Sequence, residues 1–103
     1  MRIQLFISAQ CPSCAEALQE IEHIRRLVSI PTIIYTLKRH LRTGELIAVD
    51  EYHNMFPCPD IPGVPAILFG NKLFVGDQCG QALRKELAGY NAVFSAKPNG
   101  LPN

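Results

Sequence analysis

The sequence predicts one α/β domain whose strands and helices follow the order β-α-β-α-β-β-α. Its 103 residues suffice for one compact core but not for two. With 48% hydrophobic and 18% charged residues, the chain can bury that core. The apolar residues also change along the chain between strand-like and helix-like spacing. The net charge of +1 is too small for a strong nucleic-acid or membrane-surface field, so neither partner is expected.

The first strand and the first helix are predicted within residues 2–28. Residues 2–8 alternate and then run apolar, as a short buried strand does. From Ala15 to Val28 the spacing becomes helical, with Pro12 suited to the first turn and Pro31 following the end. The apolar stripe of this helix consists of Ala17, Ile21, Ile24 and Val28, widened by Leu18 and Leu27.

A second strand is predicted at residues 32–37, which are rich in β-branched and aromatic side chains. The next stretch permits two interpretations. Thr43-Gly44 is either a turn before a returning strand at residues 46–49 or the start of a short helix. The helix is favoured because four side chains would share one side over three turns. These are Leu46, Val49, His53 and Phe56.

The remaining elements are a stiff loop, a hairpin and a last helix. Residues 56–65 hold four of the eight prolines and are expected to be extended. Residues 66–69 and 72–75 flank Gly70-Asn71, which is typical of a hairpin. The last helix is expected to have Asp77 as its N-cap and to bury Ala82, Leu83, Leu87 and Tyr90. The domain is predicted at residues 1–94 and a flexible C-terminal tail at 95–103.

The segment Cys11-Pro12-Ser13-Cys14 carries the clearest chemical signal. It lies between a predicted strand and a predicted helix, where free backbone N–H groups and the helix dipole stabilise a thiolate. Cys14 lies one turn into the helix and can attack a mixed disulfide formed at Cys11. The spacing therefore predicts a reversible dithiol/disulfide pair, although half of a zinc site has the same pattern.

The element order, the Cys-x-x-Cys at the first helix, and Val64-Pro65 before a strand together resemble the thioredoxin-like superfamily. The resemblance covers about residues 2–90. It implies a thioredoxin-like fold with a four-stranded mixed sheet flanked by helices. It also implies that Cys11 is the attacking thiol, that Cys14 is the resolving thiol, and that Pro65 is a cis proline. Val64 would then offer backbone contacts to a substrate chain.

Within that superfamily the short N-terminus and the Cys-Pro-x-Cys type are similar to glutaredoxins. Phe74-Val75-Gly76-Asp77 resembles their glutathione-holding turn, with one glycine fewer. The chain departs from the pattern at Ser13, where an aromatic residue is usual, and at Gln10, where thioredoxins have tryptophan. The resemblance implies substrate contacts at Pro12, Ser13, Val64, Pro65, Gly76 and Asp77.

Cys58 and Cys79 leave several interpretations open. If the first two strands are parallel and the hairpin is antiparallel to them, all four cysteines gather at one end of the molecule. The simplest interpretation is that Cys58 and Cys79 are small, partly buried side chains. The alternatives are a second disulfide, a resolving thiol, or ligation of zinc or an iron–sulfur cluster together with Cys11.

A basic cluster follows the second predicted strand at the same end. It is interpreted mainly as a solvated loop, and alternatively as a group that keeps Cys11 ionised or attracts an acidic partner. The cluster consists of Lys38, Arg39, His40 and Arg42.

The leading hypothesis is a thiol-disulfide oxidoreductase that reduces or exchanges protein disulfides through Cys11 and Cys14. The expected partners are protein disulfides and either glutathione or a reductase as electron donor, with no bound cofactor and no metal site. A monomer is expected. The cytoplasm is expected as the compartment, because the N-terminal apolar run is too short for a signal peptide and no stretch is long enough to span a membrane. The alternative from another class is a metal or iron–sulfur carrier that uses the cysteines.

Overall fold

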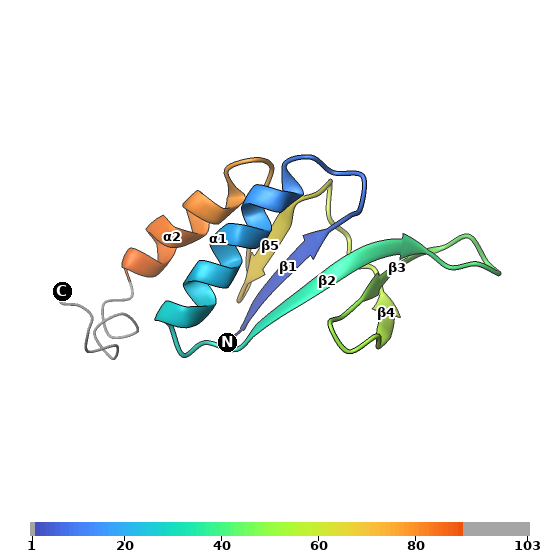
Figure 1. Ribbon diagram of the computed structural model, residues 1–103, viewed down its shortest axis with the longest axis horizontal. Coiled ribbons are helices and arrows are strands. Elements are labelled where there is room, and N and C mark those ends of the chain that lie inside the picture. Colours follow the sequence, from blue (N-terminus) through green and yellow to red (C-terminus); the bar gives the residue numbers. More distant parts are fainter. Residues whose placement is uncertain (1, 90–103) are drawn as a thin grey trace.

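The computed structural model describes residues 2–89 as one mixed sheet with two helices (Figure 1). The sheet has six strands in the order β4-β3-β2-β1-β5-β6, and its one parallel pair joins β1 to β2. The elements are β1 (Ile3–Ile7), α1 (Cys14–Leu27), β2 (Thr32–Arg39), β3 (Leu46–Val49), β4 (Met55–Pro57), β5 (Ala66–Phe69), β6 (Lys72–Val75) and α2 (Cys79–Ala88). The tail predicted at 95–103 lies outside the described residues, as does Tyr90.

The predicted fold class, a thioredoxin-like four-stranded sheet flanked by helices, is wrong. The helix expected to begin at Thr43 is absent, and the same stretch forms β3 and β4, which extend the sheet beyond β2. The alternative of a turn at Thr43-Gly44 and a strand at residues 46–49 is therefore the correct one. The described residues have two helices where three were predicted, and six strands where four were predicted.

Two tight turns explain why this stretch forms strands. Gly44 has a φ of +73°, which favours glycine, and its N–H donates to the His40 carbonyl at 2.9 Å in the β2–β3 turn. Between β3 and β4 the Asp50 carboxylate accepts hydrogen bonds from the N–H groups of Tyr52 and Asn54, at 2.8 and 2.9 Å. Leu46, Val49, His53 and Phe56 share a helical spacing in the sequence. In the structure the chain reverses at residues 50–54, so Leu46 and Val49 lie in β3 and Phe56 lies in β4.

Both helices pack on one face of the sheet (Figure 1). Side chains alternate along a strand, so Ile3 and Leu5 of β1 point to the same face as Ile34 of β2. The predicted helical stripe is confirmed in the same core, where Ile21 and Ile24 are fully buried. This core consists of Ile3, Leu5, Ala17, Ile21, Ile24, Val28, Ile34, Ile67, Phe69, Cys79, Leu83 and Leu87. No helix within residues 2–89 has the length and apolar character needed to cross a lipid bilayer.

The opposite face of the sheet has a smaller aromatic core and no helix among the described residues. Phe6 and Tyr35 stack with ring centroids 5.0 Å apart, and the edge of Phe56 meets Tyr35 at 5.8 Å. Ile61 and Val64, from the loop that precedes β5, pack against this cluster. The proline-rich loop therefore covers part of the sheet face that has no helix. Val64 of this loop lies beside the C-terminal end of β1.

Candidate active site

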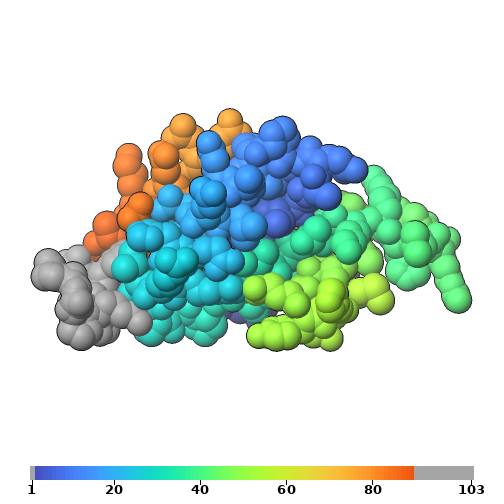
Figure 2. Space-filling model, viewed as in Figure 1, coloured from blue at the N-terminus to red at the C-terminus, as the bar shows by residue number. Residues whose placement is uncertain are grey.

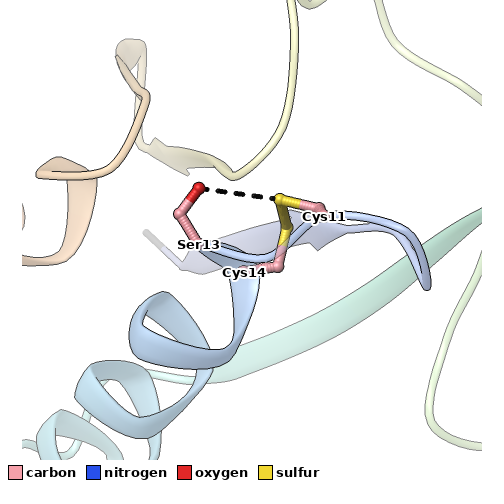
Figure 3. The surroundings of a disulfide bond; sticks show 3 residues. All are labelled: Cys11, Ser13 and Cys14. Carbon is pink, nitrogen blue, oxygen red and sulfur yellow. Dashed lines mark hydrogen bonds between the residues drawn. A yellow bond between two sulfur atoms is a disulfide. The ribbon is translucent and has the colours of Figure 1, made fainter.

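The Cys11–Cys14 pair lies in the connection between β1 and α1 (Figure 3). Its sulfurs form a disulfide, and the two Cα atoms are 5.3 Å apart. The turn is held by two backbone hydrogen bonds, from the Cys11 N–H to the Ser8 carbonyl at 3.4 Å and from the Cys14 N–H to the Cys11 carbonyl at 3.2 Å. The strand ends at Ile7 and the helix begins at Cys14, so the motif occupies the junction that the sequence predicted.

The two cysteines differ in exposure. Cys14 is the first residue of α1 and is only 3% exposed, whereas Cys11 is partly exposed. A nucleophile must reach its target and a resolving thiol need only reach the first sulfur. This difference is compatible with an attacking Cys11 and a resolving Cys14.

Ser13 occupies the N-cap position of α1, but its side chain makes no capping hydrogen bond. Its hydroxyl oxygen lies 3.9 Å from the Cys11 sulfur instead (Figure 3). The N-terminal N–H groups of a helix attract negative charge. The Ser13 hydroxyl and the N-terminus of α1 therefore both lie near the Cys11 sulfur, where they would stabilise a thiolate.

Val64 and Pro65 reach the same end of the sheet through strand pairing. Ala66 is opposite Phe6 in the antiparallel β1–β5 pair, so the residue before it lies beside the end of β1, where the cysteine loop begins. The peptide bond between Val64 and Pro65 is cis, and Pro65 is buried. The Pro65 carbonyl accepts a hydrogen bond from the Gly76 N–H at 2.9 Å. Gly76, with a φ of +103°, is therefore tied to Pro65.

Asp77 is not the N-cap of the last helix. That position belongs to Gln78, because a turn in which the Cys79 N–H donates to the Gly76 carbonyl precedes the helix. The exposed Asp77 lines a groove between the two helices together with Glu16 and Glu20. Pro12 is exposed in the cysteine loop.

The other two cysteines are free thiols. Cys79 is 1% exposed and belongs to the main core, so its interpretation as a small buried side chain fits. Cys58 is partly buried after β4 and donates to the Pro59 carbonyl at 3.3 Å. Burial raises the pKa of both thiols; for Cys79 hydrogen bonds to backbone N–H groups oppose this effect, and the nearby Asp77 charge adds to it. Both are therefore poorer nucleophiles than an ordinary thiol at neutral pH.

A groove beside the cysteine loop was missed by the sequence analysis. It has a volume of about 630 Å³ and lies between the loop that follows β1, the end of β2 and the loop that precedes β5. The sequence analysis ended the second strand at residue 37 and interpreted Lys38 and Arg39 mainly as part of a solvated loop, whereas β2 continues through both residues. The lining residues are Ser8, Ala9, Gln10, Thr36, Leu37, Lys38, Arg39, Leu46, Ile61, Pro62, Gly63 and Val64.

Residues 2–89 contain no cluster of side chains that could bind a metal ion. No three His, Cys, Asp or Glu side chains of this part of the chain lie close enough to share an ion. Comparison with known proteins adds no assignment: no family model, no curated protein and no solved structure matches the chain.

Proposed function

We propose that this protein is a thiol-disulfide oxidoreductase that uses Cys11 as the attacking thiol and Cys14 as the resolving thiol. The observation that carries the proposal is the bonded Cys11–Cys14 pair at a strand–helix junction, with one sulfur partly exposed and the other buried. The proposal rests on this local arrangement and on the resemblance of the motif to glutaredoxins. It does not depend on the fold class that the sequence suggested.

The reaction starts from the dithiol form. The Cys11 thiolate attacks one sulfur of a target disulfide, so that a Cys11–target bond forms and the target's own S–S bond breaks. The departing target thiolate takes a proton from water. Cys14 then loses its proton and attacks the Cys11 sulfur, which forms the Cys11–Cys14 disulfide and releases the second target thiol. Two electrons and two protons pass to the target, and glutathione or a reductase restores the dithiol.

The arrangement around Cys11 supports this sequence of steps. The target chain would lie against Val64 and Pro65, at the end of β1, with Pro12 and Ser13 beside the attacked sulfur. Gly76 holds the Pro65 carbonyl by its hydrogen bond, which makes it a positioning residue. Asp77 faces the groove between the helices, and a substrate that reached Gly76 would contact it there. We propose the cytoplasm as the compartment, because its thiol donors would restore the dithiol.

The test is capture of the mixed disulfide. Cys14→Ser removes the resolving thiol, so a target joined to Cys11 should accumulate and be released by dithiothreitol. Incubation of the variant with an excess of a peptide that contains one disulfide gives an adduct measurable by intact mass. The double variant Cys11→Ser/Cys14→Ser is the control and should form no adduct. If Cys14→Ser forms none either, while the wild type reduces the same peptide, the two-thiol mechanism is wrong.

The metal or iron–sulfur carrier stays the alternative from another class. It needs a third ligand beside Cys11 and Cys14, and Cys79 is enclosed in the main core. Anaerobic purification followed by metal analysis separates the two proposals, since the carrier would retain zinc or iron in stoichiometric amount and lose it in Cys11→Ser.

A further inference from the structure

The groove beside the cysteine loop exists because β2 is longer than β1. The parallel pairing of these strands ends at Ile7 and Thr36, whereas β2 continues to Arg39 through its pairing with β3. Beyond Thr36, β2 therefore has a strand partner on one side and faces the groove on the other. The loop at 61–64 forms the opposite wall. Figure 2 shows the green segment at the end of β2 projecting next to the blue segment that follows β1.

The open side of β2 presents backbone groups for pairing. At the end of the β2–β3 pair the His40 N–H donates to the Glu45 carbonyl at 2.7 Å. Backbone groups of alternate residues point to the same side of a strand, so His40 and Lys38 face β3. Leu37 and Arg39 consequently face the side of β1 and the groove. The Leu37 N–H pairs with the end of β1 at Ile7, so the groups left for the groove are the Leu37 carbonyl and the N–H and carbonyl of Arg39. An unpaired strand edge of this kind binds extended peptide segments by adding a strand.

The charged side chains that line the groove are all positive. Lys38 and Arg39 are exposed, and no carboxylate occurs among the twelve lining residues. Arg39 donates to the Gly44 carbonyl at 3.0 Å, which leaves its charge without an acidic partner among the described residues. Because neighbouring side chains alternate, Lys38 points to the helix face and Arg39 to the opposite face. Cationic side chains thus flank both faces of a chain paired with this edge.

Apolar side chains supply the rest of the surface. Leu37 and Val64 pack against the small aromatic core, while Ile61 from the proline-rich loop lies across the groove from β2. Gln10, the residue before Cys11, also lines the groove. A chain that entered along β2 would therefore pass next to the attacking cysteine.

We propose that this groove receives an extended, acidic segment of the target protein, which pairs with the open edge of β2 and brings the target disulfide to Cys11. The inference rests on the proposed function and names its substrate class. Carboxylates of the segment would lie against Lys38 and Arg39, and its backbone would bond to the Leu37 carbonyl and to the N–H and carbonyl of Arg39. The groove lies on the β2 side of the cysteine loop, away from Gly76 and Asp77.

The test compares three peptides that differ only in the residues flanking one cysteine: glutamates, glutamines or lysines. Each cysteine is linked to thionitrobenzoate, whose release reports the rate of attack by the reduced protein. The acidic peptide should react about 10-fold faster than the glutamine peptide at low salt, and this advantage should disappear at about 0.5 M salt, where charges are screened within roughly 4 Å. The lysine peptide should be slowest.

A pair of matched variants locates the effect. Lys38→Gln/Arg39→Gln should abolish the preference for the acidic peptide, so that the acidic and glutamine peptides react at equal rates. Arg26→Gln/Lys85→Gln removes the same charge from exposed positions near the ends of the two helices and should keep the preference. Equal rates of the wild type with acidic and glutamine peptides, or a preference that survives Lys38→Gln/Arg39→Gln, would overturn the proposal.

A binding measurement separates failure of the groove from failure of the chemistry. An acidic peptide with serine in place of cysteine should slow amide hydrogen exchange at Arg39. If this protection occurs but no peptide is reduced, the groove proposal holds and the oxidoreductase proposal fails. If the peptides are reduced without a charge preference and without protection at Arg39, the groove proposal alone fails.

Discussion

Gly80 in α2 packs directly against the side chain of Glu20 in α1. A Cβ at position 80 would lie 2.7 Å from the Glu20 Cγ and 2.9 Å from its Cβ, closer than such atoms approach. Glu20 itself is fixed by an ion pair with Arg84, at 2.9 Å. The two helices can therefore lie this close because position 80 has no side chain.

We expect Gly80→Ala to lower the free energy of unfolding by about 1 kcal/mol. Overpacking costs about 1–3 kcal/mol, and the better helix propensity of alanine returns about 1 kcal/mol. Urea denaturation followed by circular dichroism measures the difference. Gly63→Ala is the control, because nothing lies within 4 Å of a Cβ built there. Glu20→Ala should relieve part of the cost in the double variant, and a Gly80→Ala variant more stable than the wild type would refute the contact.

The ion pair between Arg25 and Glu51 should make stability depend on acid pH. Arg25 in α1 donates to both carboxylate oxygens of Glu51 in the β3–β4 turn, at 2.7 and 3.1 Å. This hydrogen-bonded contact lowers the pKa of Glu51. A lowered pKa in the folded state adds stability above the unfolded-state pKa, about 4.3, and this stability is lost as the pH falls through the folded-state value.

Glu51→Gln should therefore cost about 0.5–1 kcal/mol at pH 7, and the difference from the wild type should vanish at low pH. Urea denaturation at a series of pH values between 7 and 3 checks this. Glu22→Gln is a matched control, because Glu22 lies 3.7 Å from the same arginine and its side chain is 46% exposed. A cost for Glu51→Gln that stays constant over the series would show that the carboxylate charge is not responsible.

Three of the four thiols of the reduced protein, Cys11, Cys58 and Cys79, should react with an alkylating agent at distinct rates. Burial raises the pKa of Cys58 and Cys79, and Cys79 is enclosed in the main core. Only the thiolate reacts with iodoacetamide. At pH 8 we expect Cys11 to be modified first, Cys58 more slowly, and Cys79 only after denaturation. Peptide mass spectrometry after timed quenching gives the rates, and early modification of Cys79 would contradict its place in the core.

Several features of the protein could be predicted from the sequence because they depend on neighbouring residues. The stripe at Ala17, Ile21 and Ile24 defines a buried helix face whatever it packs against. The hairpin at Gly70-Asn71 follows from turn chemistry, and Gly70 has the expected positive φ of 62°. The position of the motif Cys11-Pro12-Ser13-Cys14 at a strand–helix junction also follows from local patterns, namely the apolar run before it and the helical spacing after it.

Tertiary structure decided what local patterns left open. Residues 46–56 satisfy a helical spacing, but strand pairing decides their structure, because β3 pairs with the long β2 and β4 pairs with β3. Lys38 and Arg39 are strand residues for the same reason. The difference in length between β1 and β2, and hence the groove beside Cys11, arises only when the strands are aligned in register. Local sequence patterns predict each strand separately and do not show where one strand ends relative to its neighbour. That relation exists only in the folded sheet.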